Sequence, residues 1–315
     1  MGFPNTHSAI HARISPFGTT YYLDGTNGAS SNSGKSPDAA VSTLAEASTV
    51  SSAGDTIVIA PGTYTVDVAS ASLAPTTDQT WMAAVPSYGG TPNVIITADA
   101  DDHVNAPVAI DVDNVTFRDI EFLLVAGGTN ALYLMDISQT TAVSGGACID
   151  CRFNLNDVNG ALLGVRMNDA TNATTGFVFN GCTFSGGLST TSSSYIQIGV
   201  GGALGCIVEH SSFELKAAGA DCYGVHFLDN AAAANKSYAT VIRHNDFFGP
   251  LDAGADGVGV FIGGITELEI LAMVHSNHFA FCAATAVTID KMNKGVTHNY
   301  VGDDATGILP VDPGT

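Results

Sequence analysis

A six-residue pattern that recurs seven times constrains the fold of this 315-residue chain more than any other feature. Each copy has an apolar residue, four mostly polar or small residues, and a closing residue that is Phe in six of the copies. The closing positions are 31, 31, 29, 34, 32 and 22 residues apart, a period typical of a solenoid with coils of variable length. The copies are FRDIEF (117–122), CIDCRF (148–153), FNGCTF (179–184), VEHSSF (208–213), IRHNDF (242–247), VHSNHF (274–279) and VTHNYV (296–301).

Equivalent positions of stacked coils lie above one another, about 4.8 Å apart. We therefore expect the closing phenylalanines to form one buried aromatic column. The fourth position of the last three copies is Asn, which predicts a ladder of shared amide hydrogen bonds beside the column. The column would contain Phe122, Phe153, Phe184, Phe213, Phe247 and Phe279, and the ladder Asn245, Asn277 and Asn299.

A second strand with period-two alternation precedes each copy, so one set of its side chains should face the core and the other should face outward. The inward set is Leu132, Leu134, Val165, Met167, Ile196, Ile198, Val225, Phe227, Val258, Val260, Val287 and Ile289. The outward column is where a functional site would lie on such a fold. It consists of Asp111, Tyr133, Arg166, Gln197, His226, Phe261 and Thr288.

Residues 21–66 resemble the opening of the pectate-lyase-like β-helix superfamily, in which an Asp/Asn/Gly-rich loop, a short helix and a strand ending in Pro-Gly-x-Tyr begin the solenoid. Thr43 and Glu46 fit a capping box at the start of that helix. The resemblance extends to about Leu309 and implies an all-β, right-handed parallel β-helix with a short N-terminal capping helix. The matching residues are Asp24, Gly25, Gly28, Gly34, Gly54, Asp55, Pro61, Gly62 and Tyr64.

The chain is expected to have an N-terminal attachment arm (1–20), a cap (21–54), the parallel β-helix (55–309) and a C-terminal tail (310–315). The sequence predicts no helix over the last coil, and a bare β-helix end exposes strand edges. We therefore expect a neighbouring subunit or another surface to cover that end, and analogy with β-helix spikes suggests a homotrimer.

Composition excludes several partners. The net charge of −20 repels polyanions, which argues against nucleic acid and weakens any proposal of a polyuronate substrate. We expect neither a signal peptide nor a membrane-spanning segment, because no apolar stretch is long enough. The six cysteines require no disulfides, and Cys148-x-x-Cys151 lacks a second pair that would indicate a metal site. No metal or cofactor is predicted.

The resemblance suggests two kinds of catalytic chemistry, that of a lyase and that of a glycoside hydrolase. The resembling lyases imply an acidic calcium cluster with an Arg or Lys base, whereas Arg166 is expected between Tyr133 and Gln197 with no acidic neighbour. A glycoside hydrolase would need paired carboxylates, and Asp111, Asp113 and Asp136 are the candidates. We interpret them as turn residues instead. Histidines at the third position of the repeat are interpreted as solvated turn residues rather than metal ligands; these are His210, His244 and His298.

The superfamily contains lyases, hydrolases, epimerases and phage tailspikes, so fold alone does not give function. Our leading hypothesis is a non-enzymatic phage virion protein, a capsid decoration or tail-associated component that assembles in the host cytoplasm and binds capsid or tail proteins through residues 1–20. The first alternative is a secreted-type polysaccharide lyase or glycoside hydrolase that uses Asp111, Asp113 and Asp136. The second is a module that binds a surface glycan through Tyr133, Arg166 and Phe261.

Overall fold

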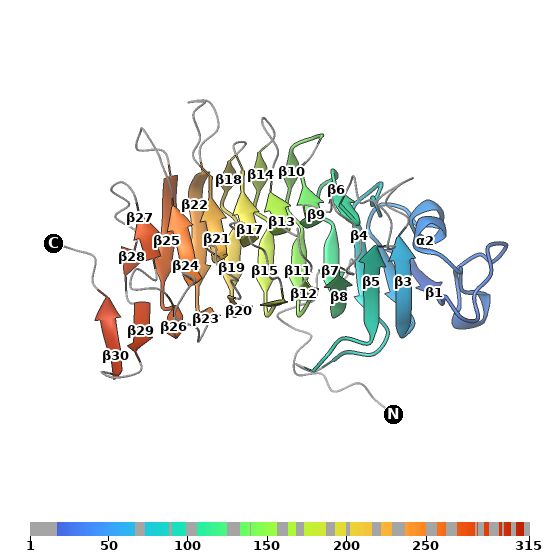
Figure 1. The fold of residues 1–315 in the computed structure, drawn as a ribbon. Helices are drawn as coiled ribbons and strands as arrows, with labels where there is room; N and C mark the ends of the chain where they lie inside the picture. Colours follow the sequence, from blue (N-terminus) through green and yellow to red (C-terminus); the bar gives the residue numbers. More distant parts are fainter. Residues whose placement is uncertain are drawn as a thin grey trace.

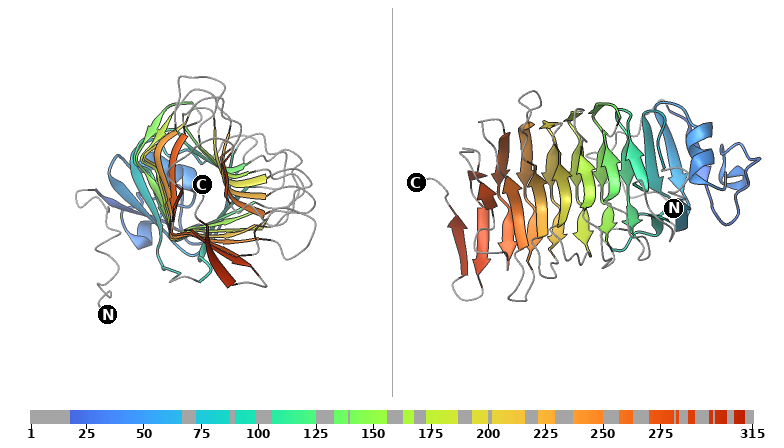
Figure 2. Two further views of the ribbon diagram at one scale, coloured as in Figure 1. Left: turned by 90° about the vertical axis from the view of Figure 1, so that its left-hand side faces the viewer. Right: turned by 45° about the horizontal axis from the view of Figure 1, so that its top comes forward.

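The computed structural model shows an all-β parallel solenoid with little helix, in which the coils lie in a row from the N-terminal to the C-terminal end (Figure 1). Three sheets surround a common interior when the molecule is seen along its axis (Figure 2). The structure describes residues 18–66, 73–87, 90–98, 106–124, 133–138, 140–155, 163–167, 173–186, 193–199, 202–215, 222–228, 237–249, 257–262, 270–280, 282, 287–289, 296–297, 299–303 and 307–311.

We name the three sheets A, B and C, and from β6 onward each coil passes from C to A and then to B. Sheet A contains β1 (Thr20–Leu23), β2 (Asp55–Ile59), β4 (Gln79–Ala83), β7 (Thr116–Arg118), β10 (Val143–Ser144), β11 (Ala147–Ile149), β14 (Thr174–Thr175), β15 (Val178–Asn180), β18 (Ala203–Leu204), β19 (Ile207–Glu209), β22 (Ser237–Arg243), β25 (Ile270–His275) and β28 (Val296–Thr297).

Sheet B contains β3 (Gly62–Val66), β5 (Val94–Ala98), β8 (Ile120–Leu123), β12 (Arg152–Asn154), β16 (Thr183–Ser185), β20 (Ser212–Glu214), β23 (Asp246–Phe248), β26 (His278–Ala280), β29 (Asn299–Asp303) and β30 (Gly307–Val311). Sheet C contains β6 (Val108–Ile110), β9 (Tyr133–Ile137), β13 (Leu163–Met167), β17 (Ser193–Ile198), β21 (Cys222–Phe227), β24 (Gly257–Ile262) and β27 (Val287–Ile289).

The repeated hexad forms the sharp corner between sheets A and B. Two residues separate the strands at each of the five corners from β11–β12 to β25–β26, whereas four to nine separate consecutive strands on either side of sheet C from β12 to β28. The third hexad position has a left-handed backbone, which Gly, Asn, Asp and His adopt more readily than other residues. Its φ angles are 55° at Asp119, 53° at Asp150, 66° at Gly181, 52° at His210, 55° at His244 and 56° at Ser276.

The predicted aromatic column is confirmed, and all six rings are buried. The centroid distances are 5.2 Å for Phe122–Phe153, 4.7 Å for Phe153–Phe184, 4.6 Å for Phe184–Phe213, 4.6 Å for Phe213–Phe247 and 4.9 Å for Phe247–Phe279. The last four pairs are nearly parallel, with interplanar angles of 12° or less. One column therefore holds six successive coils in register.

The predicted amide ladder is confirmed for its two described members. Asn277 Oδ1 accepts from the amide nitrogen and the backbone N–H of Asn245, both at 3.0 Å. Asn245 Oδ1 accepts in turn from the backbone N–H of Ser211 at 2.9 Å. The ladder continues as Ser211 Oγ accepts from the N–H of Cys182 at 3.1 Å. The side chain of Asn299 lies outside the described residues.

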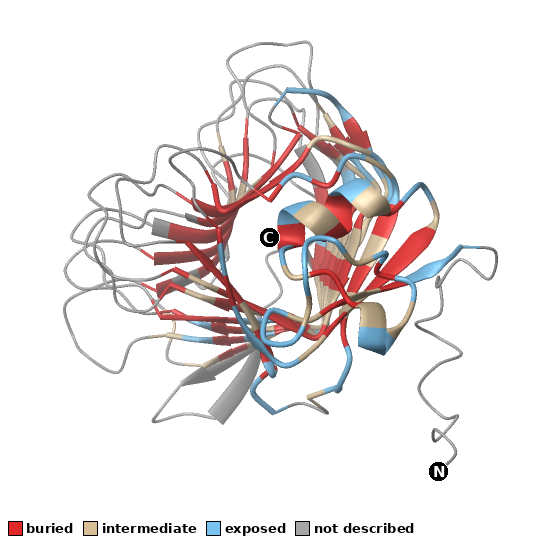
Figure 3. Cartoon of the chain, turned by 90° about the vertical axis from the view of Figure 1, so that its right-hand side faces the viewer, coloured by how far each residue is buried: buried red, intermediate tan, exposed pale blue. Residues whose placement is uncertain are grey.

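A short helix, α2 (Leu44–Val50), lies at the N-terminal end of the solenoid, preceded by the 3-10 turn η1 (Pro37–Ala39) (Figure 3). The predicted capping box is present: Thr43 accepts from the N–H of Glu46, and the Glu46 carboxylate accepts from the N–H of Thr43. Leu44 and Ala47 belong to the apolar core. No helix among the described residues is long and apolar enough to cross a membrane.

The C-terminal end differs from the parallel coils before it. Strand β30 pairs antiparallel with β29, so the chain ends in a hairpin on sheet B. Pro310 and Val311, which we assigned to a tail, belong to this strand. Residues 1–17 of the predicted attachment arm lie outside the described residues, whereas β1 begins at Thr20.

Candidate functional site

The outer face of sheet C carries a column of aligned side chains, one from each coil. The strand register confirms the outward column from Arg166 onward and corrects its first two members. Ala109 and Asp136, rather than Asp111 and Tyr133, occupy those positions. The observed column is Ala109, Asp136, Arg166, Gln197, His226 and Phe261. The register pairs Thr288 with Phe261, but the side chain of Thr288 lies outside the described residues.

The first member changes because Asp111 lies beyond the end of β6, at Ile110. The second changes because strict alternation fails within β9. In β9, Leu134 and Met135 are both buried in the core, so Tyr133 and Asp136 are the residues that flank an inward-facing pair. Met135 and Ile137 are therefore aligned with Val165 and Met167, whereas we had placed Leu132 and Leu134 there. Leu132 lies outside the described residues.

Leu134 is the residue that breaks the alternation in β9. In three of the next four strands the equivalent residue is glycine, namely Gly164, Gly224 and Gly259. A Cβ on Gly164 would lie 2.6 Å from the carbonyl oxygen of Tyr195, and one on Gly224 would lie 2.5 Å from that of Gly259. The next coil therefore leaves no room for a side chain there. Recurring glycine within a strand is a sequence signal for such an irregularity.

Arg166 and Asp136 form a two-pronged ion pair across adjacent strands. The Nε and Nη2 atoms of Arg166 donate to the two carboxylate oxygens of Asp136 at 3.1 and 2.6 Å. The Asp136 side chain is completely buried and that of Arg166 is 17% exposed. The guanidinium carbon also lies 4.1 Å from the ring centroid of Tyr133, a cation–π contact. Our expectation that Arg166 lacks an acidic neighbour is therefore wrong.

One coil further on, a hydroxyl contacts an imidazole. Ser194 Oγ lies 3.1 Å from Nδ1 of His226. Burial lowers the pKa of His226 to about 4, so the ring is neutral at pH 7. A neutral ring that accepts from this hydroxyl at Nδ1 carries its N–H on Nε2. The imidazole is thus oriented without being charged.

Aromatic rings gather around the same imidazole. The Tyr223 ring is centred 4.6 Å from that of His226 and 4.9 Å from that of Phe261, while His226 and Phe261 are 5.1 Å apart. Gln197 lies between this group and the Arg166 pair in the strand register. Gln197 is partly exposed, and no hydrogen bond of its amide is found among the described residues.

The three candidate carboxylates of the hydrolase alternative each have partners of their own. Asp111 accepts hydrogen bonds from the backbone N–H and hydroxyl of Thr140, at 2.8 and 2.9 Å, and Asp113 accepts from the N–H of Ser144 at 2.7 Å. Both carboxylates thereby bind the backbone of the next coil. Asp113 lies in a turn, as we interpreted it, whereas the turn interpretation is wrong for Asp136, which lies in strand β9. Asp136 is instead committed to Arg166.

The cysteines and the corner histidines fit structural roles. The six cysteines are free thiols, and burial raises the pKa values of Cys148 and Cys182 well above their usual range. His210 and His244 stack 5.2 Å apart at the corner. Within the described ranges, no three His, Cys, Asp or Glu side chains are grouped to hold a metal ion.

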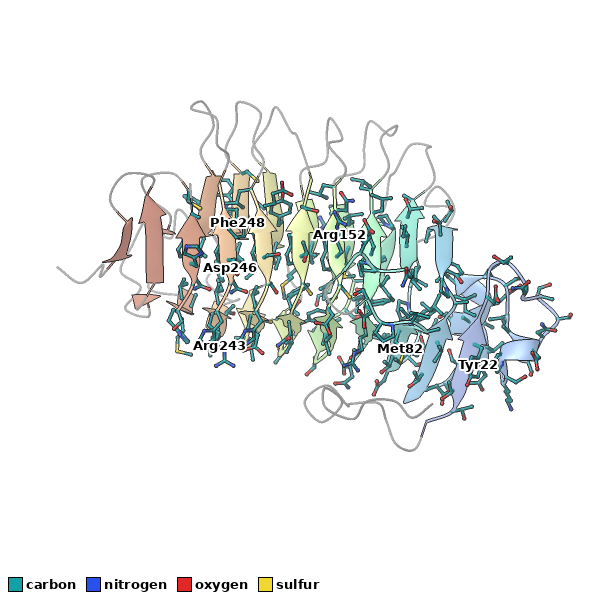
Figure 4. The ribbon with its side chains drawn as sticks, turned by 90° about the horizontal axis from the view of Figure 1, so that it is seen from below. Tyr22, Met82, Arg152, Arg243, Asp246 and Phe248 are labelled. Atoms are coloured by element: carbon teal, nitrogen blue, oxygen red, sulfur yellow. The ribbon has the colours of Figure 1, made fainter. Side chains whose placement is uncertain are left out.

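The outer faces of sheets A and B carry dispersed polar and apolar side chains (Figure 4). Arg243 pairs with Glu209 at 2.8 Å on sheet A, and Arg152 lies 3.9 Å from Glu121 on sheet B. Phe248 on sheet B is 41% exposed. Because they lie on other sheets, the Arg243–Glu209 pair and Phe248 offer control substitutions for the charged and aromatic groups on sheet C.

Comparison with known proteins locates the chain by its fold. No protein-family model and no curated protein matches the sequence. Two crystal structures of the pectin methylesterase from Aspergillus niger, differing in deglycosylation, are similar to it with TM-scores of 0.58 and 0.56. The likeness is one of fold. Sequence identity is 12% and 13%, and each alignment covers 93% of this chain and 92% of the esterase.

A pectate lyase is also similar, with a TM-score of 0.44, 13% identity, and coverage of 89% of this chain and 79% of the lyase. At this identity the esterase comparison shows the fold alone, a parallel β-solenoid.

Proposed function

We propose that this protein binds a polysaccharide along the outer face of sheet C. The observation that carries the proposal is the column from Asp136 to Phe261, which aligns polar and aromatic side chains over five consecutive strands. Four steps of about 4.8 Å give a row roughly 19 Å long. Such a row suits an extended polymer that runs along the solenoid axis.

The side chains suit the chemistry of sugars. The partly exposed ring of Phe261 can pack against the C–H face of a sugar ring, because it combines a large apolar surface with rigid geometry. The buried Tyr223 ring, centred 4.9 Å away, supports it from behind. Gln197 and the ring nitrogen of His226 that does not contact Ser194 can exchange hydrogen bonds with hydroxyl groups. Tyr133 and Arg166, two of the residues in the glycan-binding alternative, lie in direct contact on the same face as the third, Phe261.

The similar solved structures support this choice over the virion hypothesis. The proteins with TM-scores above 0.5 are pectin methylesterases, which by name act on a polysaccharide. A virion location, a homotrimer and attachment through residues 1–20 stay predictions.

A polysaccharide-modifying enzyme is the second candidate. It is favoured by the contact of Ser194 Oγ with His226, since an adjacent base is the usual way to activate a serine hydroxyl. The low pKa of His226 makes it a weak base in the free protein. A hydrolase with two acidic residues receives no support, because the Asp111 and Asp113 carboxylates accept hydrogen bonds from Thr140 and Ser144 of the next coil.

A glycan array followed by titration calorimetry tests the binding proposal. Phe261→Ala and Gln197→Ala should each weaken binding of the best ligand about tenfold, and Phe248→Ala, which removes an exposed ring from sheet B, should leave it unchanged. Circular dichroism checks that each variant is folded. Absence of glycan binding, or equal loss in all three variants, would refute a site on sheet C.

The enzyme candidate has its own assay. Reducing ends, unsaturated products and released ester groups are measured with each bound polysaccharide. Product formation that disappears in Ser194→Ala, with binding retained, would establish the second candidate. Binding without turnover would leave the protein a binder.

A further inference from the structure

We infer that the polysaccharide bound on sheet C is uncharged, so that a polyuronate or a sulfated glycan is a poor ligand. This inference rests on the proposed function and adds the class of ligand. It follows from the charges on the outer face of the sheet. Among the described side chains there, Arg166 is the one permanent cation and Asp136 the one carboxylate.

The charge of Arg166 is already used within the protein. Both carboxylate oxygens of Asp136 accept from its guanidinium, and its remaining flank faces the Tyr133 ring. An anionic ligand could attract Arg166 only in competition with a completely buried carboxylate. Separation from Arg166 would leave the Asp136 charge in a site with little solvent, which is strongly unfavourable.

The next polar groups on the face are neutral. His226 carries no charge at pH 7, because burial lowers its pKa to about 4. Gln197 offers an amide, and Ser194 a hydroxyl. Hydrogen bonding without a net charge matches hydroxyl-rich sugars better than carboxylates or sulfates.

The rest of the chain acts in the same direction. The net charge of −20 gives a long-range repulsion toward polyanions. In the sequence, the segments that connect sheet C to the other sheets contain more acidic residues than lysines. A polyanion would therefore meet repulsion at a distance and an already paired arginine at the surface.

The test uses pairs of polysaccharides that share a backbone but differ in charge: dextran with dextran sulfate, hydroxyethylcellulose with carboxymethylcellulose, and fully methyl-esterified with unesterified polygalacturonate. Affinities are measured at 20 and 200 mM salt, where screening differs strongly. We expect at least tenfold preference for the uncharged member of whichever pair binds, with little change on adding salt. Tighter binding of the anionic member, weakened by salt, would overturn the inference.

A charge-release variant sharpens the test. Asp136→Asn removes the negative partner of Arg166 and should create salt-sensitive binding of the anionic polysaccharides that the wild-type protein lacks. The matched control is Glu209→Gln, which removes the partner of Arg243 on sheet A and should leave anion binding unchanged. Equal gains in both variants would show a general charge effect and overturn the role of sheet C. Failure of every polysaccharide to bind would instead contradict the proposed function.

Discussion

Replacement of Arg166 by Met is expected to destabilise the protein by about 3 kcal/mol, because it removes the cation that faces a completely buried carboxylate. Removing one partner of a buried ion pair typically costs about 3–5 kcal/mol. The lower end applies because the Arg166 side chain is 17% exposed. Loss of the cation–π contact with Tyr133 adds about 0.5–1 kcal/mol within this range.

The double variant Arg166→Met/Asp136→Leu separates the charge from the packing. It replaces the pair by apolar side chains, so its free energy of unfolding should return to within about 1 kcal/mol of the wild-type value. The two substitutions would then be strongly non-additive, as expected of residues in contact.

Urea denaturation measures these differences, with the fluorescence of Trp81 and circular dichroism as independent probes. Trp81 is the single tryptophan and is completely buried in β4, so its emission reports on the core. Coincident transitions are needed because a solenoid can unfold in parts. A loss of less than about 0.5 kcal/mol in Arg166→Met, or additive losses in the double variant, would show that the Asp136 charge is not held by Arg166.

Three further substitutions test the frame and the site. Phe213→Ala should lower the free energy of unfolding in urea by about 3–5 kcal/mol, since its ring lies between two stacked neighbours. Replacement of the exposed Phe248 by Ala should lower it by less than about 0.5 kcal/mol, and equal losses would contradict a packed column. Asn245→Ala should lower the free energy of unfolding by about 2–4 kcal/mol, because it leaves the buried N–H of Ser211 without an acceptor. An unchanged urea midpoint would show that the ladder does not stabilise the fold. The wild-type protein should lose stability relative to His226→Gln as pH falls from 6.5 to 4, by up to about 3 kcal/mol (2.5 pH units at 1.36 kcal/mol), because only the unfolded chain takes up the proton in this window. A pH-independent difference would exclude a buried neutral His226.

The solenoid could be predicted from the sequence because stacked coils need the same kind of side chain at equivalent positions. Phe at the corner of six copies and Asn at the fourth position of the last three are visible as a period of about 30 residues. The Phe column and the two described members of the Asn ladder were found where they were expected. The C-terminal hairpin was not foreseen, because β30 carries no copy of the repeat.

The site was harder to predict, since it depends on one break in the alternation. Period-two counting gave the outward positions from Arg166 to Phe261 but failed in β9, where two successive residues face the core. It therefore missed Asp136 as the partner of Arg166. Gly164 and Gly224 mark the same break in neighbouring strands and could have revealed it. The contact between Ser194 and His226 could not be found in this way, because it joins different columns.

The two-residue corner between sheets A and B, shared by the five coils from β11–β12 to β25–β26, has a consequence for how such a protein can change over time. Its left-handed backbone and buried fourth residue tolerate few insertions, whereas the connections that border sheet C already vary from four to nine residues. Changes of length can thus accumulate along both rims of the proposed binding face while the corner keeps every coil aligned. A lineage could acquire a new ligand by exchanging rim segments, and duplication of a whole coil would extend the binding row by one more side chain.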